Sequence, residues 1–314
     1  MPKKSTNRKL RSLEEIEKAI IGAFICKHFG KKGHINSVDA EGSTPLWLAF
    51  FYKKSYIMLL LIKYGANFNV KQNGFTFLSY IISYGYEKIV FDLLKRGVNI
   101  NEPNNSYTPL MYASTSDNLN ILVAFLARSS RVQINTKDID GETALMKAVR
   151  VNKCSNIAFL INYGVNINHQ SDTGETALSL ACINGNIEAV QTLLEYGIYY
   201  ETLKIDITNN AGYTPLMCAT VSLNLQPAII YMLCEAGANM NHVSNDNKTF
   251  IDLALLNVLS RKSFGFTNLF FIFEELKLSA FIDFEWIVCL LEFIPVQFLG
   301  LYLISFGHLR CKYI

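Results

Sequence analysis

The chain has 314 residues, of which 50% are hydrophobic and 18% are charged, so its composition excludes an intrinsically disordered protein and allows a large core. The formal net charge is +3, and most of the positive excess lies in the N-terminal segment, which leaves the rest of the chain close to neutral. Its seven cysteines are scattered and form no CxxC pair, which excludes a standard zinc motif and predicts reduced thiols in the cytoplasm.

The N-terminal segment divides into a basic tail and an apolar helix. Residues 1–12 are predicted to form a flexible tail whose basic residues are Lys3, Lys4, Arg8, Lys9 and Arg11. We interpret this tail as a solvated chain end, and the alternative is contact with an acidic partner, a membrane surface or nucleic acid. Residues 13–35 contain an apolar run, Ala19–Cys26, that follows three glutamates, and acidic residues in this place are atypical of a secretory signal.

A sequence unit recurs seven times in the middle of the chain. Each copy carries Thr-x-Leu or Thr-x-Ile, and the copies begin at Thr44, Thr76, Thr108, Thr143, Thr176, Thr214 and Thr249. Six copies have Ala five residues after the Thr, and the second copy has Ile81 there. Because Thr is a good N-cap and Pro or Ala follows it in five copies, we expect a helix to begin directly after each Thr.

Glycines mark the other boundaries of the unit. A glycine stands 21 residues after the Thr in four copies and two residues later in a fifth, at Gly65, Gly97, Gly164, Gly197 and Gly237. The run before each of them has the length and periodicity of a helix, so the glycine is expected to end a second helix in the left-handed conformation. Another glycine, preceded by Asn or Asp in copies such as Asn73-Gly74 and Asp140-Gly141, predicts a tight turn before the next Thr.

This unit of turn, helix, short break and second helix resembles the ankyrin repeat over residues 36–270. The resemblance implies an all-α solenoid of about seven helix-turn-helix units with β-turn or hairpin loops, and it makes residues 13–35 an N-terminal capping helix. The family usually has His three residues after the Thr, and this chain has instead Trp47, Ser79, Met111, Met146, Ser179, Met217 and Asp252. We therefore expect some hydrogen bonds between repeats to be lost while the fold is kept.

Two copies depart from the regular length. Ser129 occupies the glycine position of the third copy, and the residues after Gly197 lengthen the following turn region by about five residues. Both segments are expected to bulge from one edge of the stack. We interpret them as tolerated loop insertions, and the alternative is that they touch a partner.

The C-terminal segment, residues 271–314, contains an apolar stretch from Trp286 to Phe306 that includes one charge, Glu292, and Pro295 near its middle. A helix of this length reaches roughly 31 Å, about the thickness of a hydrocarbon core. Two interpretations stay open: a hydrophobic helical cap on the end of the solenoid, or a membrane anchor. We favour the cap because Glu292 and Pro295 both oppose a spanning helix.

The sequence contains no motif of a nucleotide-binding loop, a metalloprotease, a serine hydrolase, an EF-hand or a kinase. We therefore predict a non-catalytic scaffold that binds another protein, without cofactor or metal, and that is cytoplasmic and monomeric with no nucleic-acid partner. One alternative is a membrane-tethered ankyrin adaptor or effector held by the C-terminal hydrophobic helix. Another is an enzyme whose site is not recognisable from the sequence.

Candidate binding residues follow from the resemblance. In the ankyrin family the partner usually lies along the concave face, made of turn tips and the exposed side of the first helices. Carried over to this chain, the positions just before each Thr and at the end of each first helix include Phe51, Tyr52, Phe75, Tyr84, Tyr107, Glu142, Glu175 and Tyr213. Exposed aromatic side chains supply a large contact area. The alternative is that these aromatic residues pack against neighbouring repeats, in the space left by the missing His.

Overall fold

The computed structural model describes residues 13–104, 106–127, 132–224 and 226–260. Every named element in these residues is a helix, and none of them forms a strand. The chain divides into two compact units. The first unit comprises the residues up to Thr173 together with Glu195–Thr202, and the second comprises Gly174–Leu194 and the residues from Leu203 onward.

After an N-terminal helix, α1 (Leu13–Phe29), the described residues form six helix pairs and the first helix of a seventh repeat. The first helices of the repeats are α2 (Pro45–Phe51), α4 (Phe77–Ser83), α6 (Pro109–Thr115), α8 (Ala144–Arg150), α10 (Ala177–Asn184), α12 (Pro215–Val221) and α14 (Phe250–Ser260). The second helices are α3 (Ser55–Lys63), α5 (Glu87–Lys95), α7 (Leu119–Ala127), α9 (Cys154–Asn162), α11 (Ile187–Tyr199) and α13 (Pro227–Glu235). The second helix of the seventh repeat would fall outside the described residues.

Every first helix begins at the residue after its repeat Thr, as predicted. In six repeats the Thr hydroxyl accepts a hydrogen bond from the backbone N–H three residues later, as Thr176 does from Ser179 at 3.2 Å. This bond pairs one of the backbone donors that a helix start leaves free. The residue five positions after the Thr is buried in every repeat, from 0% exposed at Ala49 to 4% at Ala254. A small side chain at this position allows neighbouring helices to pack closely.

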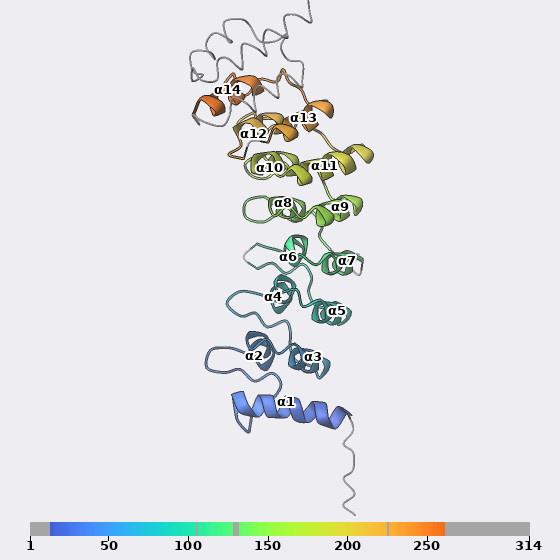
Figure 1. Ribbon diagram of the computed structural model, residues 1–314. Helices are drawn as coiled ribbons and strands as arrows, with labels where there is room; N and C mark the ends of the chain where they lie inside the picture. The colour runs from blue at the N-terminus through green and yellow to red at the C-terminus, as the bar shows by residue number, and fades with distance from the viewer. Residues whose placement is uncertain (1–12, 105, 128–131, 225, 261–314) are drawn as a thin grey trace, which may run out of the picture. The chain divides into compact units, whose positions relative to one another are not determined.

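The first unit has two layers of helices. In Figure 1, α2, α4, α6 and α8 follow one another in one layer, and α3, α5, α7 and α9 follow one another in the second. The loops that precede the first helices extend from the edge of the first-helix layer. Large side chains fill the core of this unit, and Trp47, Phe77 and Phe125 are each at most 1% exposed. Burial of the apolar faces of both layers therefore holds the unit together.

Helix α1 occupies residues 13–29 of the segment 13–35 for which a capping helix was expected, and it packs against α2 and α3. Its residue Glu17 is 6% exposed and accepts hydrogen bonds from Lys63 Nζ at 2.6 Å and from Tyr64 Oη at 2.8 Å. The hydrogen bond from Lys63, and then the one from Tyr64, hold the pKa of Glu17 below its ordinary value. Burial and then the same hydrogen bond raise the pKa of Tyr64 to about 12.

In the second unit, α10, α12 and α14 pack against one another in chain order, and α13 packs against α12. The core of this unit includes Leu193, Ile230 and Leu233, which are each 0% exposed. Ser222, at the end of α12, donates a hydrogen bond to the carbonyl of Ile183 at 2.6 Å. This bond ties the ends of two successive first helices together.

The glycine boundaries are confirmed at four second helices and wrong at one. Residues Gly65, Gly97, Gly164 and Gly237 follow their helices with positive φ. Gly197 instead lies within α11, which continues to Tyr199. The residues after Gly197 are Ile-Tyr-Tyr rather than the Ala-Asn or Val-Asn of the other copies, so the turn-forming Asn is missing there. The left-handed residue is Glu201, with φ 54°, and the Thr202 N–H closes the end by bonding the Gly197 carbonyl at 3.0 Å. The extra residues after Gly197 therefore first extend α11 to Tyr199 and only then lengthen the turn region.

Side chains in the loops link successive repeats. The Asn36 Oδ1 accepts a hydrogen bond from the Asn67 N–H at 2.8 Å, and Asn135 Oδ1 accepts one from the Asn166 N–H at 3.0 Å. Each bond joins equivalent loops one repeat apart. The first Asn of an Asn-x-Asn segment has a local role, because its side chain accepts a hydrogen bond from the N–H two residues later, as Asn67 Oδ1 does from the Asn69 N–H at 3.0 Å.

The loss of the family His is partly compensated. Trp47, which stands at that position in the first repeat, donates from Nε1 to the Val70 carbonyl at 3.0 Å, in the loop before the next first helix. In other repeats the side chain at this position turns back to its own Thr, as Ser179 Oγ does by accepting from the Thr176 N–H at 2.8 Å. The expected loss of hydrogen bonds between repeats therefore applies where this side chain bonds back to its own Thr, as at Ser179. It does not apply at Trp47, which bonds to the next loop.

Three sequence predictions lie outside the described residues: the basic tail (1–12), the bulge at Ser129, and the segment 271–314 with Trp286–Phe306. Among the helices that the structure does describe, none is both long enough and apolar enough to cross a bilayer.

Candidate protein-binding surface

Three exposed aromatic side chains lie at the C-terminal ends of α2 and α4, the first helices of repeats one and two. Phe51 is the last residue of α2, and Tyr52 and Tyr84 directly follow α2 and α4. Their exposed fractions are 49%, 53% and 59%. We call Phe51, Tyr52 and Tyr84 the aromatic surface. All three belong to the first unit, and all three are among the residues predicted from the sequence.

Each ring of the aromatic surface rests on another ring. Phe51 stacks on Trp47 with centroids 6.0 Å apart and an interplanar angle of 29°. Tyr84 meets Phe50 edge to face at 5.1 Å and 90°, and Tyr52 stacks on His28 of α1 at 5.1 Å and 30°. Trp47 and Phe50 are 1% and 5% exposed, so Phe51 and Tyr84 rest on buried rings, whereas the His28 ring beside Tyr52 is only half-buried. One side of each ring therefore packs against another ring and the other side faces solvent, and contact with a partner stays a prediction.

Three other predicted aromatic residues are less exposed. Phe75 packs on Tyr80 and Tyr107 packs on Tyr112, each with centroids 5.3 Å apart, and both Phe75 and Tyr107 are half-buried. In the second unit Tyr213 is also half-buried, and its hydroxyl donates to Asp246 Oδ2 at 3.4 Å. These rings border the turn region and offer less free surface than Phe51, Tyr52 and Tyr84.

Glu142 does not form part of an exposed surface, because it is 3% exposed and lies in an ion-pair network. Its Oε2 lies 2.6 Å from Lys147 Nζ, which also lies 2.5 Å from Asp138 Oδ2. Arg150 donates from Nε to Glu142 Oε1 at 2.8 Å. The Lys147 ammonium lies 4.8 Å from the centroid of the Tyr107 ring. The network therefore joins the turn before α8 to α8 itself and to the preceding repeat.

The network shifts the pKa values of its members. Burial alone would raise the pKa of the Glu142 carboxyl, but hydrogen bonds from Arg150 and Lys147 outweigh it and lower that pKa. The pKa of Asp138 is lowered against burial in the same way, by Lys147 and by backbone N–H groups. Burial alone would lower the pKa of Lys147, and the hydrogen bonds to Asp138 and Glu142 raise it instead. All three groups are therefore held in their charged forms.

Glu175, in the second unit, is also interior, with an exposed fraction of 9%. Its Oε1 accepts a hydrogen bond from Asn209 Nδ2 at 2.7 Å, and Cys218 Sγ lies 4.0 Å from its Oε2. Burial, and then the nearby Glu175 charge, raise the pKa of the Cys182 and Cys218 thiols. These thiols are therefore poor nucleophiles, and Glu175 has a structural role rather than a contact role.

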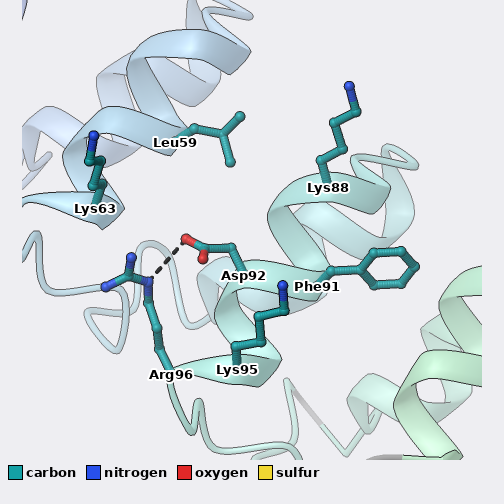
Figure 2. A pocket seen from close by; sticks show the side chains of 7 residues that line it. All are labelled: Leu59, Lys63, Lys88, Phe91, Asp92, Lys95 and Arg96. Atoms are coloured by element: carbon teal, nitrogen blue, oxygen red, sulfur yellow. Dashed lines mark hydrogen bonds and ion pairs between the residues drawn. The ribbon is translucent and has the colours of Figure 1, made fainter. Parts of the chain in front are cut away.

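A hollow between α3 and α5 was not predicted from the sequence (Figure 2). Four of its lining side chains are basic, and the only signal in the sequence was the set of Lys and Arg residues on or directly after these two second helices, Lys63, Lys88, Lys95 and Arg96. Across the part of the chain that the structure describes, no three His, Cys, Asp or Glu side chains gather where they would hold a metal ion.

Thr-capped first helices, second helices ended by glycine and side-chain links between successive loops define a class of stacked helix-pair repeat proteins. Within that class the chain belongs to the ankyrin-repeat family. The family model for ankyrin repeats (3 copies) matches residues 17–104, 101–171 and 152–244. The family and the all-α repeat fold expected from the sequence are therefore confirmed.

Relatives come from varied sources. The chain is 32% identical over 148 residues to the ankyrin repeat protein FPV031 of Fowlpox virus (strain NVSL), covering 45% of this chain and 42% of that protein. It is 26% identical over 230 residues to the ankyrin repeat protein L371 of Acanthamoeba polyphaga mimivirus, covering 71% of this chain and 29% of that protein. The chain thus spans less than half the length of either relative. The crystal structure of the human ASB11 ankyrin repeat domain superposes with a TM-score of 0.58 at 23% identity, covering 68% of this chain and 92% of that domain, which shows the shared fold.

Proposed function

We propose that this chain is a non-catalytic scaffold that binds another protein through the aromatic surface of its first unit. Ankyrin repeats are generally modules of protein–protein interaction, and members of the family are typically not enzymes. The observation that carries the proposal is that Phe51, Tyr52 and Tyr84 expose about half of their side chains while other rings support them, buried Trp47 and Phe50 under Phe51 and Tyr84 and half-buried His28 beside Tyr52.

The aromatic surface has the properties of an interaction hot spot. Each ring offers on the order of 100 Å² of apolar surface if half of a typical aromatic side chain is free, which corresponds to about 2.5 kcal/mol when it is covered. Because stacking already restrains the rings, little conformational entropy is lost when a partner covers them. Interface hot spots are rich in Tyr and lie on such rigid supports.

The predicted cytoplasmic location and monomeric state are part of this proposal, as is the preference for a cap over a membrane anchor at Trp286–Phe306. Cell fractionation of the full-length protein tests the location. Membrane association that resists alkaline extraction would favour the anchor.

Site-specific photocrosslinking tests the proposed surface directly. We would place p-benzoylphenylalanine at position 52, at position 84 or, as a control, at position 56 of the full-length protein. Tyr56 is as exposed as Tyr52, 53% in both cases, but it lies on α3 in the second-helix layer. We expect one partner protein to crosslink from positions 52 and 84 and not from position 56. Equal crosslinking from all three positions, or crosslinking from position 56 alone, would rule out the aromatic surface.

A further inference from the structure

A basic hollow lies on the second-helix layer of the first unit. It has a volume of about 420 Å³ and is lined by Leu59, Lys63, Lys88, Phe91, Asp92, Lys95 and Arg96. Figure 2 shows the first two of these side chains on one helix, α3, and the others on α5 or directly after it. The aromatic surface is on the other layer of the unit, so the hollow is a separate feature.

The lining of the hollow is strongly positive, because it holds four cations and one carboxylate. The carboxylate, Asp92, is already paired with Arg96, whose Nε lies 3.0 Å from Asp92 Oδ2. Lys63 is paired with Glu17 of α1 but is still 52% exposed. Lys88 and Lys95 are exposed, and neither has an ion-pair partner among the described residues. The hollow therefore has two cations that no described carboxylate neutralises.

The cations of α5 are arranged for contact rather than for folding. The buried residues of α5 are Ile89, Val90 and Leu93, and they pack the helix onto the unit. Lys88, Phe91, Asp92 and Lys95 follow the spacing i, i+3, i+4 and i+7, so they share the opposite stripe of the helix. On α3, Leu59 and Lys63 are four residues apart and share a stripe as well. The half-buried side chains of Leu59 and Phe91 thus add an apolar element to a basic hollow.

The size of the basic region indicates the kind of ligand. The next second helix, α7 (Leu119–Ala127), contains no charged residue, so among the described residues the row of cations does not continue onto α7. Adjacent helices lie roughly 10 Å apart and an extended peptide rises about 3.3 Å per residue, so only about three to six residues cross the hollow. Phe91 could stack on a base of a single-stranded nucleic acid, but such a strand is held by a longer row of phosphate contacts than the described cations of this hollow provide.

We propose that the hollow between α3 and α5 binds a short, extended, acidic segment of a protein partner that carries an apolar side chain. Carboxylates of the segment pair with Lys88 and Lys95, and its apolar side chain packs against Leu59 and Phe91. The pairing is between partly solvated charges, so the affinity decreases as salt is added.

Fluorescence anisotropy with the full-length protein tests the proposal. The probe is a fluorescein-labelled octapeptide with acidic residues around one central Phe, and its control has Gln and Asn in place of the acidic residues. We expect only the acidic peptide to bind, and Lys88→Gln with Lys95→Gln to weaken it about tenfold, since two charge pairs are lost. The matched control, Lys31→Gln with Lys32→Gln, removes the same charge from exposed residues outside the hollow and should leave the affinity unchanged.

Two further variants distinguish a peptide site in the hollow from binding at the aromatic surface. Phe91→Ser should weaken the peptide that contains Phe severalfold and leave an all-acidic peptide unchanged, whereas Tyr84→Ala should change neither, because it belongs to the aromatic surface. Circular dichroism and melting temperature verify that each variant is folded. Equal weakening by the two double variants would overturn the proposal. The proposal would also be overturned if a single-stranded oligonucleotide of equal charge bound more tightly than the acidic peptide and if Lys88→Gln with Lys95→Gln weakened that binding. The hollow would then be a nucleic-acid site.

Discussion

At the scale of single residues, burial separates side chains that look equivalent in the sequence. Glu142 and Glu175 stand directly before their Thr residues, at a place where the family often contacts partners, yet they are 3% and 9% exposed. The acidic side chain of Glu142 faces Lys147 and Arg150, which follow it by five and eight residues. The spacing alone does not distinguish a surface carboxylate from an interior one, because the turn before the helix decides where the side chain points.

Glu142→Gln should destabilise the protein by about 3 kcal/mol, because it removes one carboxylate partner from the buried Lys147 and the partner of the more exposed Arg150. Lys147 keeps Asp138 as a partner, so the loss is smaller than for a fully unpaired charge. Urea unfolding at pH 7 measures the effect. The control is Glu102→Gln, which removes a more exposed pair with Lys71 and should cost less than about 1 kcal/mol. Equal losses in the two variants would show that the network does not stabilise the fold.

The same network predicts how stability depends on pH. The pKa values of Glu142 and Asp138 are lowered by folding, so their contribution is complete above their unfolded values near about 4 and is lost as the pH falls through the folded values. The pKa of Lys147 is raised by folding, so its contribution is complete below about 10.4 and is lost only at more alkaline pH. The free energy of unfolding, measured with urea, should therefore decrease more between about pH 5 and pH 3 for the parent than for Glu142→Gln. Parallel pH curves would contradict the pKa directions.

Ala181→Glu tests the register of the first helices. Ala181 is 0% exposed in α10, so a glutamate there places an unpaired charge in the core of the second unit, and we expect this unit to lose its cooperative unfolding transition. Thermal unfolding followed by circular dichroism measures the change. The control Ala228→Glu is in the same unit but exposed, near the start of α13, where an acidic residue is favourable. A parent-like melting curve for Ala181→Glu would mean that the helix register is wrong.

At the scale of elements, helix starts were predictable from the sequence and one helix end was not. The start of each first helix depends on the local sequence, because Thr is itself a good N-cap and the residue after it fits the first turn. All seven first helices therefore begin where expected. A helix end depends on the residues that come after the glycine. Gly197 is followed by residues that continue the helix, and it lies in α11 without positive φ, whereas Gly65 ends α3 with φ 91°. The short-range pattern of glycine spacing could not show this difference.

Gly141→Ala should destabilise the turn before α8 more than Gly42→Ala destabilises the turn before α2. Both glycines have positive φ, 73° and 80°, which costs an alanine roughly 1 kcal/mol or more. Only at Gly141 would an added Cβ lie 2.7 Å from the Asp172 backbone nitrogen, in the stacked turn of the next repeat, whereas nothing lies within 4 Å at Gly42. Urea unfolding of both variants measures the difference. Equal destabilisation would show that the stacked turns move apart without cost.

At the scale of the whole molecule, two surfaces of different chemistry occur on the two helix layers of the first unit. The aromatic surface could be predicted, because its residues stand at fixed positions after Thr44 and Thr76, where a first helix of this family ends on an exposed face. The basic hollow could not, because it arises only when Lys63 of α3 and Lys88 and Lys95 of α5 are brought together by packing. Local chemistry is thus readable along the chain, whereas a site formed between two helices requires their contact geometry.

Calorimetric titration of the crosslinked partner against the full-length protein tests most directly whether the aromatic surface binds a protein. Tyr52→Ala with Tyr84→Ala should reduce the binding free energy by at least about 2 kcal/mol, the scale of interface hot spots, with helicity and melting temperature nearly unchanged. Tyr56→Ala, which removes an equally exposed ring from the other layer, should bind like the parent. Unchanged affinity in the double variant, or a fall in melting temperature that accounts for the whole loss, would contradict the proposed binding role and assign these rings to packing alone.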